Sequence, residues 1–256
     1  MIEVDVAGTK LPIEELHFAF LNNKLRNEFG FLESSRNNIP VNGSGEIMPL
    51  YTYPCYEYLR SINWNDAKVF EFGCGYSTLW WNSQGANVYG VESEQEWADK
   101  VNPYVKLNIS VETGVKEYIE SIHKHKIEFD VIIIDGIVRY DCVLPATDAL
   151  KAGGMIILDN SDWHTNTKES LDNFSELIPI HFHGFKPIHV ETETTSCYIH
   201  RDFNKKPRTI LPMGGTKRAN HKDDFPTQTS LEIEVQGRKD LNEDDAFDLF
   251  DKSLDN

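Results

Sequence analysis

The chain has 256 residues, of which 40% are hydrophobic, so it is long enough for one large domain with a buried core. Its formal net charge of −16 argues against nucleic acid or an anionic membrane as a partner. No apolar stretch approaches a membrane span, the first residues lack a signal-peptide pattern, and four scattered cysteines indicate reduced thiols, so we expect a cytoplasmic protein.

Changes in composition divide the chain into three predicted parts. Residues 1–46 are mixed and polar, with a helix predicted over 13–28. Residues 47–204 form the main domain. Residues 205–256 are a polar, charged extension, for which we expect a short strand at 231–235, a short helix at 244–254 and partial disorder.

The main domain alternates between strand and helix signals, which predicts an α/β fold with a doubly wound, mostly parallel sheet and helices on both faces. An aromatic-rich helix is expected within 46–66, before the first strand. Strands are predicted at 69–72, 87–91, 108–111, 131–134, 155–158, 180–183 and 196–200. Helices are predicted at 78–83, 95–101, 115–123, 143–150 and 168–177, with a helix stop and turn at 151–154.

A Gly-x-Gly turn follows the first of these strands. Gly73 and Gly75 allow a ligand close to the backbone, and the helix that begins at Ser77 or Thr78 offers free N–H donors. Thr78 stands where a dinucleotide-binding turn has its third glycine. Glu71, just before the turn, would repel a pyrophosphate and suits a cationic ligand such as S-adenosylmethionine.

The next two predicted strands end in candidate cofactor contacts. Glu92, with the adjoining Ser93, follows the second strand, where a carboxylate can accept hydrogen bonds from both ribose hydroxyls of an adenosine. A solvated strand-end glutamate is the alternative. Thr113 and Gly114 follow the third strand and would line an adenine pocket or form a plain turn.

Acidic and amide side chains follow the fourth and fifth strands. Asp135 should face the same cleft as Gly73, because ligands of open parallel sheets bind outside the carboxyl ends of the strands. Asp159 and Asn160 end the next strand. With Asp135 they are hard oxygen ligands suited to Mg²⁺ or Ca²⁺. The alternative is that Asp159 and Asn160 cap the turn.

The loops beyond these strands hold the candidates for substrate contact, since such loops commonly carry function. Arg139 and Tyr140 follow Asp135, and His164 follows Asn160. We consider Asp135, Arg139 and His164 as catalytic residues, with His164 as a general base. A plain surface histidine is the alternative for His164.

These motifs together resemble the class I S-adenosylmethionine-dependent methyltransferases over about residues 47–204. The resemblance rests on the segments 71–78, 129–136 and 150–159 and on the strand that ends at Glu92. It implies a Rossmann-like, seven-stranded sheet whose last strand is antiparallel, with S-adenosylmethionine as the cofactor. The cofactor-binding residues would be Glu71, Gly73, Cys74, Gly75, Ser77, Thr78, Glu92, Ser93, Thr113, Gly114 and Asp135.

Two narrower likenesses bear on the reaction. Bacterial members of the class with unassigned substrates share late segments that look like 184–188 and Thr195-Ser196 of this chain. The chain also looks like the metal-dependent catechol and caffeoyl-CoA O-methyltransferases, which hold a divalent cation at positions matching Asp135, Asp159 and Asn160. It departs from the catechol enzymes, which have a catalytic lysine where this chain has Val138.

The sequence thus predicts a methyltransferase that acts on an oxygen atom of a small molecule or sugar. An acidic body and four tyrosines within 51–58 suit a neutral or cationic acceptor better than nucleic acid. Two alternatives remain, an NAD-dependent oxidoreductase on a similar fold and a non-catalytic cofactor-binding or assembly protein. The oligomeric state stays open, a homo-oligomer included.

Overall fold

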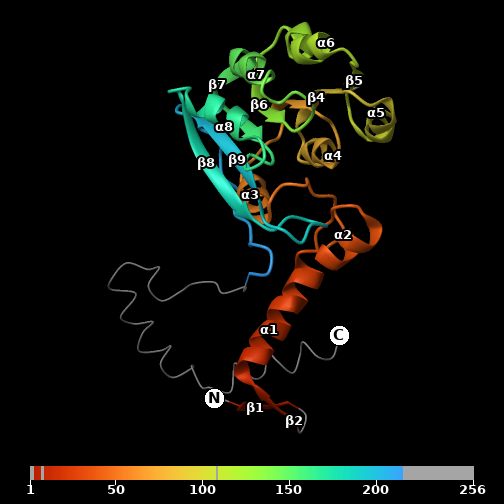
Figure 1. Cartoon of the computed structure of the whole chain (residues 1–256), viewed down its shortest axis with the longest axis vertical. Helices are drawn as coiled ribbons and strands as arrows, with labels where there is room; N and C mark the ends of the chain where they lie inside the picture. Colours follow the sequence, from red (N-terminus) through yellow and green to blue (C-terminus); the bar gives the residue numbers. More distant parts are fainter. Residues whose placement is uncertain (1–2, 7–8, 108, 216–256) are drawn as a thin grey trace. The chain divides into compact units, whose positions relative to one another are not determined.

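The computed structural model describes residues 3–6, 9–107 and 109–215 (Figure 1). The strand expected at 231–235 and the helix expected at 244–254 lie outside the described residues. Among the residues that are described, no helix is long and apolar enough to cross a membrane.

The N-terminal part holds more structure than the sequence predicted. The helix expected over 13–28 is confirmed, but it changes from an α-helix to a π-helix after Asn23. A hairpin and a further short helix were not predicted. The elements are β1 (Glu3–Val6), β2 (Thr9–Pro12), α1 (Ile13–Asn23), the π-helix η1 (Lys24–Glu28) and α2 (Phe31–Asn37).

The main domain follows the predicted alternation of strands and helices. Its first half contains α3 (Tyr53–Arg60), β3 (Lys68–Phe72), α4 (Tyr76–Ser83), β4 (Asn87–Glu92), α5 (Gln95–Val101), the 3₁₀ helix η2 (Asn102–Tyr104) and β5 (Ser110–Val111). Its second half contains α6 (Val115–Glu120), the 3₁₀ helix η3 (Ser121–His125), β6 (Phe129–Ile134), α7 (Val143–Ala149), β7 (Leu150–Leu158), α8 (Thr165–Asp172), β8 (Leu177–Gly184) and β9 (Glu193–His200).

A seven-stranded sheet in the order β5-β4-β3-β6-β7-β9-β8 organises the domain. Neighbouring strands from β5 to β7 pair in parallel, whereas β9 pairs antiparallel with both β7 and β8. This confirms the predicted fold class, including the antiparallel last strand. The chain order reverses at β3, so the ends of β3, β4 and β6 border the crevice where such sheets bind ligands.

Side chains alternate between two buried layers, one on each face of the sheet. Val69, Val131 and Ile157 point to the face that α3 and α4 cover, where they pack with Trp64 and Trp81. The neighbouring residues of the same strands point to the opposite face, which packs against residues of α6, α7 and α8. Burial of both faces explains why the parallel strands appear as almost unbroken apolar runs.

The aromatic segment before β3 packs into the core, and its contact with an acceptor stays a prediction. Tyr51, Tyr53 and Tyr56 are buried, and Tyr58 is half-buried against Phe182. The apolar face of the short helix α3 packs on the sheet, so these rings fill space between the layers. Of the four, Tyr56 also lines a cavity, of about 690 Å³.

Two predicted boundaries near β7 and α8 were wrong. The turn expected at 151–154 lies within β7, where the pairing shifts between Phe129↔Leu150 and Val131↔Met155. Gly153, with φ of +80°, permits this irregularity in the strand. The helix expected at 168–177 begins earlier and ends at Asp172, because β8 already begins at Leu177.

Residues 205–214 contact the main domain. Lys205 donates to Asp130 at 2.8 Å, and Pro207 forms an isolated β-bridge with Ile62. Lys24 of η1 donates to the carbonyl oxygen of Gly214 at 2.6 Å. The domain boundary placed at residue 204 stays a prediction.

Candidate functional site

A cavity of about 280 Å³ lies at the carboxyl ends of β3, β4 and β6. It includes most of the residues predicted to bind a cofactor. Those that line it are Gly73, Cys74, Gly75, Ser77, Glu92, Ser93 and Asp135. The sequence motifs therefore converge on one site, as the parallel sheet requires.

The glycine turn after β3 fits closely beneath this cavity. Gly73 has φ of +86°, and a Cβ atom there would lie 2.3 Å from the Cα of Gly136, at the end of β6. No other residue type fits this contact without a shift of the backbone. At Gly75, by contrast, nothing lies within 4 Å of the Cβ position, so the turn is open on the side where a ligand can approach.

Glu71 stabilises the glycine turn from the buried side, away from the cavity. It is fully buried, and its carboxylate accepts hydrogen bonds from the hydroxyls of Ser77 and Thr78, in the first turn of α4. Thr78 Oγ1 in turn accepts from the amide of Gly75 at 2.9 Å. Burial raises the pKa of Glu71 to about 8, although the hydrogen bonds from Ser77 and Thr78 act to lower it.

Glu92 joins the turn to the end of β4. Its Oε2 accepts from the amide of Cys74 at 2.9 Å, and its Oε1 accepts from the amides of Ser93 and Glu94 at 2.7 and 3.0 Å. Ser93 Oγ also donates to Oε1, at 3.2 Å. Oε2 therefore retains the capacity to accept a further hydrogen bond at the cavity wall.

Four of the predicted cofactor contacts do not line the cavity. Glu71 and Thr78 lie behind the glycine turn, where they hold it in place. Thr113 and Gly114 lie between β5 and α6, and Gly114 directly precedes the first residue of that helix. Contact of these four with a ligand stays a prediction.

Arg139 ties together the ends of β6 and β7. Its guanidinium donates to the carbonyl oxygens of Asp135, Gly136 and Asp159, at 2.9, 3.0 and 2.6 Å, and to Asp135 Oδ1 at 2.9 Å. A weaker contact of 3.4 Å reaches Asn160 Oδ1. Because its donors bond to the protein itself, Arg139 links the ends of β6 and β7, and we call this set of hydrogen bonds the Arg139 brace. Its predicted catalytic role stays a prediction.

Asp135 lines the cavity and also interacts electrostatically with the buried acid Asp159. Burial raises its pKa to about 7, and the charge of Asp159 adds to this rise, whereas Arg139 and Lys186 oppose it. Its Oδ1 pairs with Arg139, and no donor of the described chain contacts its Oδ2. Asp135 can therefore gain or lose a proton near neutral pH.

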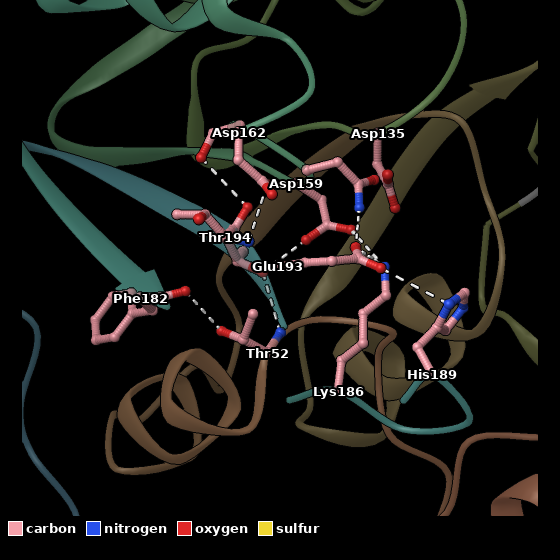
Figure 2. A network of polar contacts seen from close by, with 12 residues as sticks. Thr52, Asp135, Asp159, Asp162, Phe182, Lys186, His189, Glu193 and Thr194 are labelled. Atoms are coloured by element: carbon pink, nitrogen blue, oxygen red, sulfur yellow. Dashed lines mark hydrogen bonds and ion pairs between the residues drawn. The ribbon is translucent and has the colours of Figure 1, made fainter. Parts of the chain in front are cut away.

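Behind Asp135, a buried lysine occupies the centre of a cluster of acids (Figure 2). Lys186, from the segment between β8 and β9, pairs with Glu193 and lies 3.9 Å from Asp159 Oδ2. Asp159 Oδ1 accepts from Thr195 Oγ1 at 2.6 Å, and Asn160 donates its amide to Glu193. Burial raises the pKa of Asp159, which Lys186 opposes.

This arrangement does not fit the predicted divalent-cation site. Asp135 Oδ1 is paired with Arg139, and Asp159 is held by Thr195 and Lys186. Asn160 directs its amide nitrogen to an acid and its oxygen toward Arg139. The described residues contain no group of three or more His, Cys, Asp or Glu side chains arranged to hold a metal ion.

His164 lies in a different cavity, of about 440 Å³, lined also by Arg139, Tyr140 and Trp163. Burial and the charge of Arg139 lower its pKa, so the ring is neutral at pH 7 and able to accept a proton. Asp135 does not line this cavity, so Arg139 stands between the two candidate bases. The role of His164 as a base stays a prediction.

Sequence reasoning missed Lys186 and Glu193 and did not connect Thr195 with Asp159. The weak signal was that the segments 184–188 and Thr195-Ser196 look like those of the bacterial members of the class. The antiparallel pairing of β7 with β9, in which Leu158 faces Ser196, brings Glu193 and Thr195 of β9 close to the end of β7.

Comparisons with known proteins give similarity of structure alone. No family model and no curated protein matches the chain. Solved structures that resemble it include a predicted caffeoyl-CoA O-methyltransferase from Staphylococcus aureus, at 15% identity, 74% coverage of this chain, 100% of that chain and a TM-score of 0.49. The O-methyltransferase TomG from Streptomyces achromogenes, solved with SAM, has 13% identity, 58% and 77% coverage and a TM-score of 0.43. An rRNA methylase from Streptococcus thermophilus has 10% identity, 56% and 92% coverage and a TM-score of 0.43.

These identities and TM-scores are too low to assign a reaction or an acceptor, which must be argued from the site itself. The fold does not depend on them, because the strand order and the antiparallel last strand are seen directly. The chain has the Rossmann-like, seven-stranded sheet with an antiparallel last strand that its resemblance to the class I S-adenosylmethionine-dependent methyltransferases implies.

Proposed function

We propose that the chain is an S-adenosylmethionine-dependent methyltransferase that methylates an oxygen atom of a small molecule or sugar. The observation that carries the proposal is the charge of the cavity. Glu92, Glu94 and Asp135 line it, and no lysine, arginine or histidine of the described chain does. Such a wall attracts a sulfonium and an ammonium group and repels the pyrophosphate of a dinucleotide.

The residues that line the cavity suit the parts of this cofactor. The open backbone at Gly75 admits the methionine part, and Glu92 Oε2 can accept a hydrogen bond from a ribose hydroxyl. Asp135, at the end of β6, adds negative charge where the cationic end would lie. Bound S-adenosylmethionine supplies a methyl group that its positive sulfur already activates.

The protein then has to align the acceptor and take up one proton. In the transfer, the acceptor oxygen forms a bond to the methyl carbon as the carbon–sulfur bond breaks, and the hydroxyl proton leaves for a base. Asp135, whose pKa lies at about 7, is the candidate that lines the cavity, and His164 is the second candidate. Arg139 holds Asp135 in position.

The acceptor class follows from charge. The chain carries 41 acidic and 25 basic residues, which disfavours a polyanionic acceptor such as RNA or DNA. A second cavity of about 690 Å³ adjoins the first and shares Gly75, Tyr76 and Trp97 with it. Its aromatic and apolar lining suits a neutral molecule with an apolar part.

Calorimetric titration of the full chain tests the proposal. We expect S-adenosylmethionine and S-adenosylhomocysteine to bind at one site and NAD⁺ not to bind. Release of S-adenosylhomocysteine, followed over a panel of hydroxylated acceptors, then tests turnover. Binding of NAD⁺ in place of S-adenosylmethionine would support the oxidoreductase alternative. Tight cofactor binding without turnover on any acceptor would support the non-catalytic alternative.

A further inference from the structure

Lys186 is a buried cation beside Asp159, one of the residues predicted to hold a divalent ion. The residue is 5% exposed, and its ammonium pairs with Glu193 and lies 3.9 Å from Asp159 Oδ2 (Figure 2). On its outer side the ammonium lies 5.8 Å from the ring centroid of Trp163. His189 covers the second oxygen of Glu193, at 3.7 Å.

A lysine is buried in this way only when anions compensate its charge, because desolvation of an ammonium costs several kcal/mol. The side chains of both partners are themselves only 4% exposed. Removal of the ammonium would leave Asp159 and Glu193 as buried acids held by hydrogen bonds from Thr195 and Asn160 alone, without a compensating positive charge between them. The ammonium and the two acids therefore depend on one another.

The charges of the cluster are nearly balanced without a metal. With all three acids ionised, Asp135, Asp159 and Glu193 contribute three negative charges, and Arg139 and Lys186 contribute two positive charges. The balance is −3 + 2 = −1. A divalent cation added beside the ammonium would change the balance to +1 and would lie close to a like charge, at a cost in Coulomb energy.

We propose that Lys186 is the built-in cation of this cleft, and that its ammonium fills the place of a divalent ion between Asp159 and Glu193. Lys186 is a positioning residue, since it fixes these two acids and, through Asn160, the end of β7. It follows that methyl transfer proceeds without a divalent metal. That consequence rests on the proposed function, whereas the exclusion of a divalent ion from the cleft does not.

Mn²⁺ binding to the full chain, measured by electron paramagnetic resonance without any cofactor, tests the proposal. Because an acidic chain binds Mn²⁺ weakly at many places, the comparison is between wild type and Asp159→Asn, which keeps an oxygen for Thr195. We expect the two to bind Mn²⁺ equally. Mn²⁺ bound by wild type and lost in Asp159→Asn would overturn the proposal.

The Lys186→Ala variant tests whether loss of the ammonium creates a cation site. Removal of the ammonium should open a cation site, so we expect Mn²⁺ to bind at least ~10-fold more tightly than to wild type, and Asp159→Asn added to this variant should abolish the gain. Lys186→Arg, which keeps the charge, and Lys100→Ala, an exposed lysine paired with Glu96, should show no gain. A folded Lys186→Ala variant without the gain would overturn the proposal.

Two readouts separate this proposal from the proposed function. S-adenosylmethionine binding tests the function and needs no Mn²⁺, and Mn²⁺ binding tests the role of Lys186 and needs no S-adenosylmethionine. If Lys186→Ala does not fold, the comparison of wild type with Asp159→Asn still decides. With an acceptor in hand, we expect full turnover in excess EDTA, and loss of turnover restored by Mg²⁺ would contradict the metal-free site.

Discussion

Gly73 and Gly136 touch where β3 and β6 end, since a Cβ on Gly73 would lie 2.3 Å from the Cα of Gly136. The turn and the strand end can therefore approach only because both residues are glycines. Gly75, two residues further on, has open space at its Cβ position. The two glycines of the turn thus have different tasks, the first in packing and the second in access for a ligand.

Alanine at each glycine should separate these tasks. We expect Gly73→Ala to lower the free energy of unfolding by about 2 kcal/mol, because it adds a clash at a positive φ. Gly75→Ala should leave stability unchanged but weaken S-adenosylmethionine binding at least ~10-fold. Denaturant unfolding and calorimetry measure the two effects. Equal loss of stability in both variants would contradict the assignment of packing to Gly73 and ligand access to Gly75.

Glu92→Gln tests the ribose contact. We expect about 10-fold weaker S-adenosylmethionine binding, equivalent to ~1.4 kcal/mol, because one charged acceptor is lost. Glu94→Gln is the matched control, since Glu94 lines the same cavity with an exposed side chain and its substitution removes the same charge. Equal effects of the two variants would mean that Glu92 contributes charge alone.

Glu71 should make stability depend on pH. Its pKa is about 8 in the folded chain and near 4.5 when exposed, so the folded state holds a proton that the unfolded state has lost. The contribution to stability is therefore complete below pH 4.5 and is lost as pH rises through 8. We expect Glu71→Gln, compared with wild type by denaturant unfolding from pH 5 to 8.5, to flatten this fall. An unchanged slope would show that Glu71 is ionised in the folded chain.

The brace formed by Arg139 should contribute strongly to stability. Arg139→Met leaves the carbonyl oxygens at the ends of β6 and β7 without donors, so we expect a loss of about 3 kcal/mol in unfolding free energy. Arg139→Lys should not restore it, because one ammonium lacks the fork geometry. Arg60→Met, at a half-buried pair with Glu57, should cost less than ~1 kcal/mol. Similar losses at both arginines would refute the brace.

The two candidate bases make different predictions for the pH dependence of turnover. If Asp135 accepts the proton, Asp135→Asn should lower kcat at least ~100-fold and weaken S-adenosylmethionine binding far less, by the loss of one charge from the cavity wall. His164→Gln should then leave the acidic limb of the pH–rate profile in place. Disappearance of that limb in His164→Gln, with its midpoint in wild type below 6.5, would assign the proton to His164 instead.

The strands and the glycine turn could be predicted because their signals are local. Runs such as Val131–Ile134 are apolar on both faces, and Gly73 has a backbone conformation that few other residues adopt. Glu92 and Asp135 could be placed near that turn because parallel strands end at one edge.

Other features could not be predicted from local pattern. Tyr51 and Tyr53 appear in the sequence as an accessible aromatic segment, but packing of α3 on the sheet buries them. Lys186 is one charged residue in a loop, and its role depends on the register in which β9 pairs with β7, which local sequence pattern does not reveal. The same pairing converts the predicted metal ligands Asp159 and Asn160 into partners of Thr195 and Glu193.

We propose that the acidic cavity beside Gly75 binds a cationic adenosyl cofactor. The most direct measurement is a calorimetric titration of the full chain with S-adenosylmethionine and, in parallel, with NAD⁺. We expect one saturable site for S-adenosylmethionine, with weaker binding in the Glu92→Gln variant, and no binding of NAD⁺. Saturable binding of NAD⁺ with no binding of S-adenosylmethionine would contradict it.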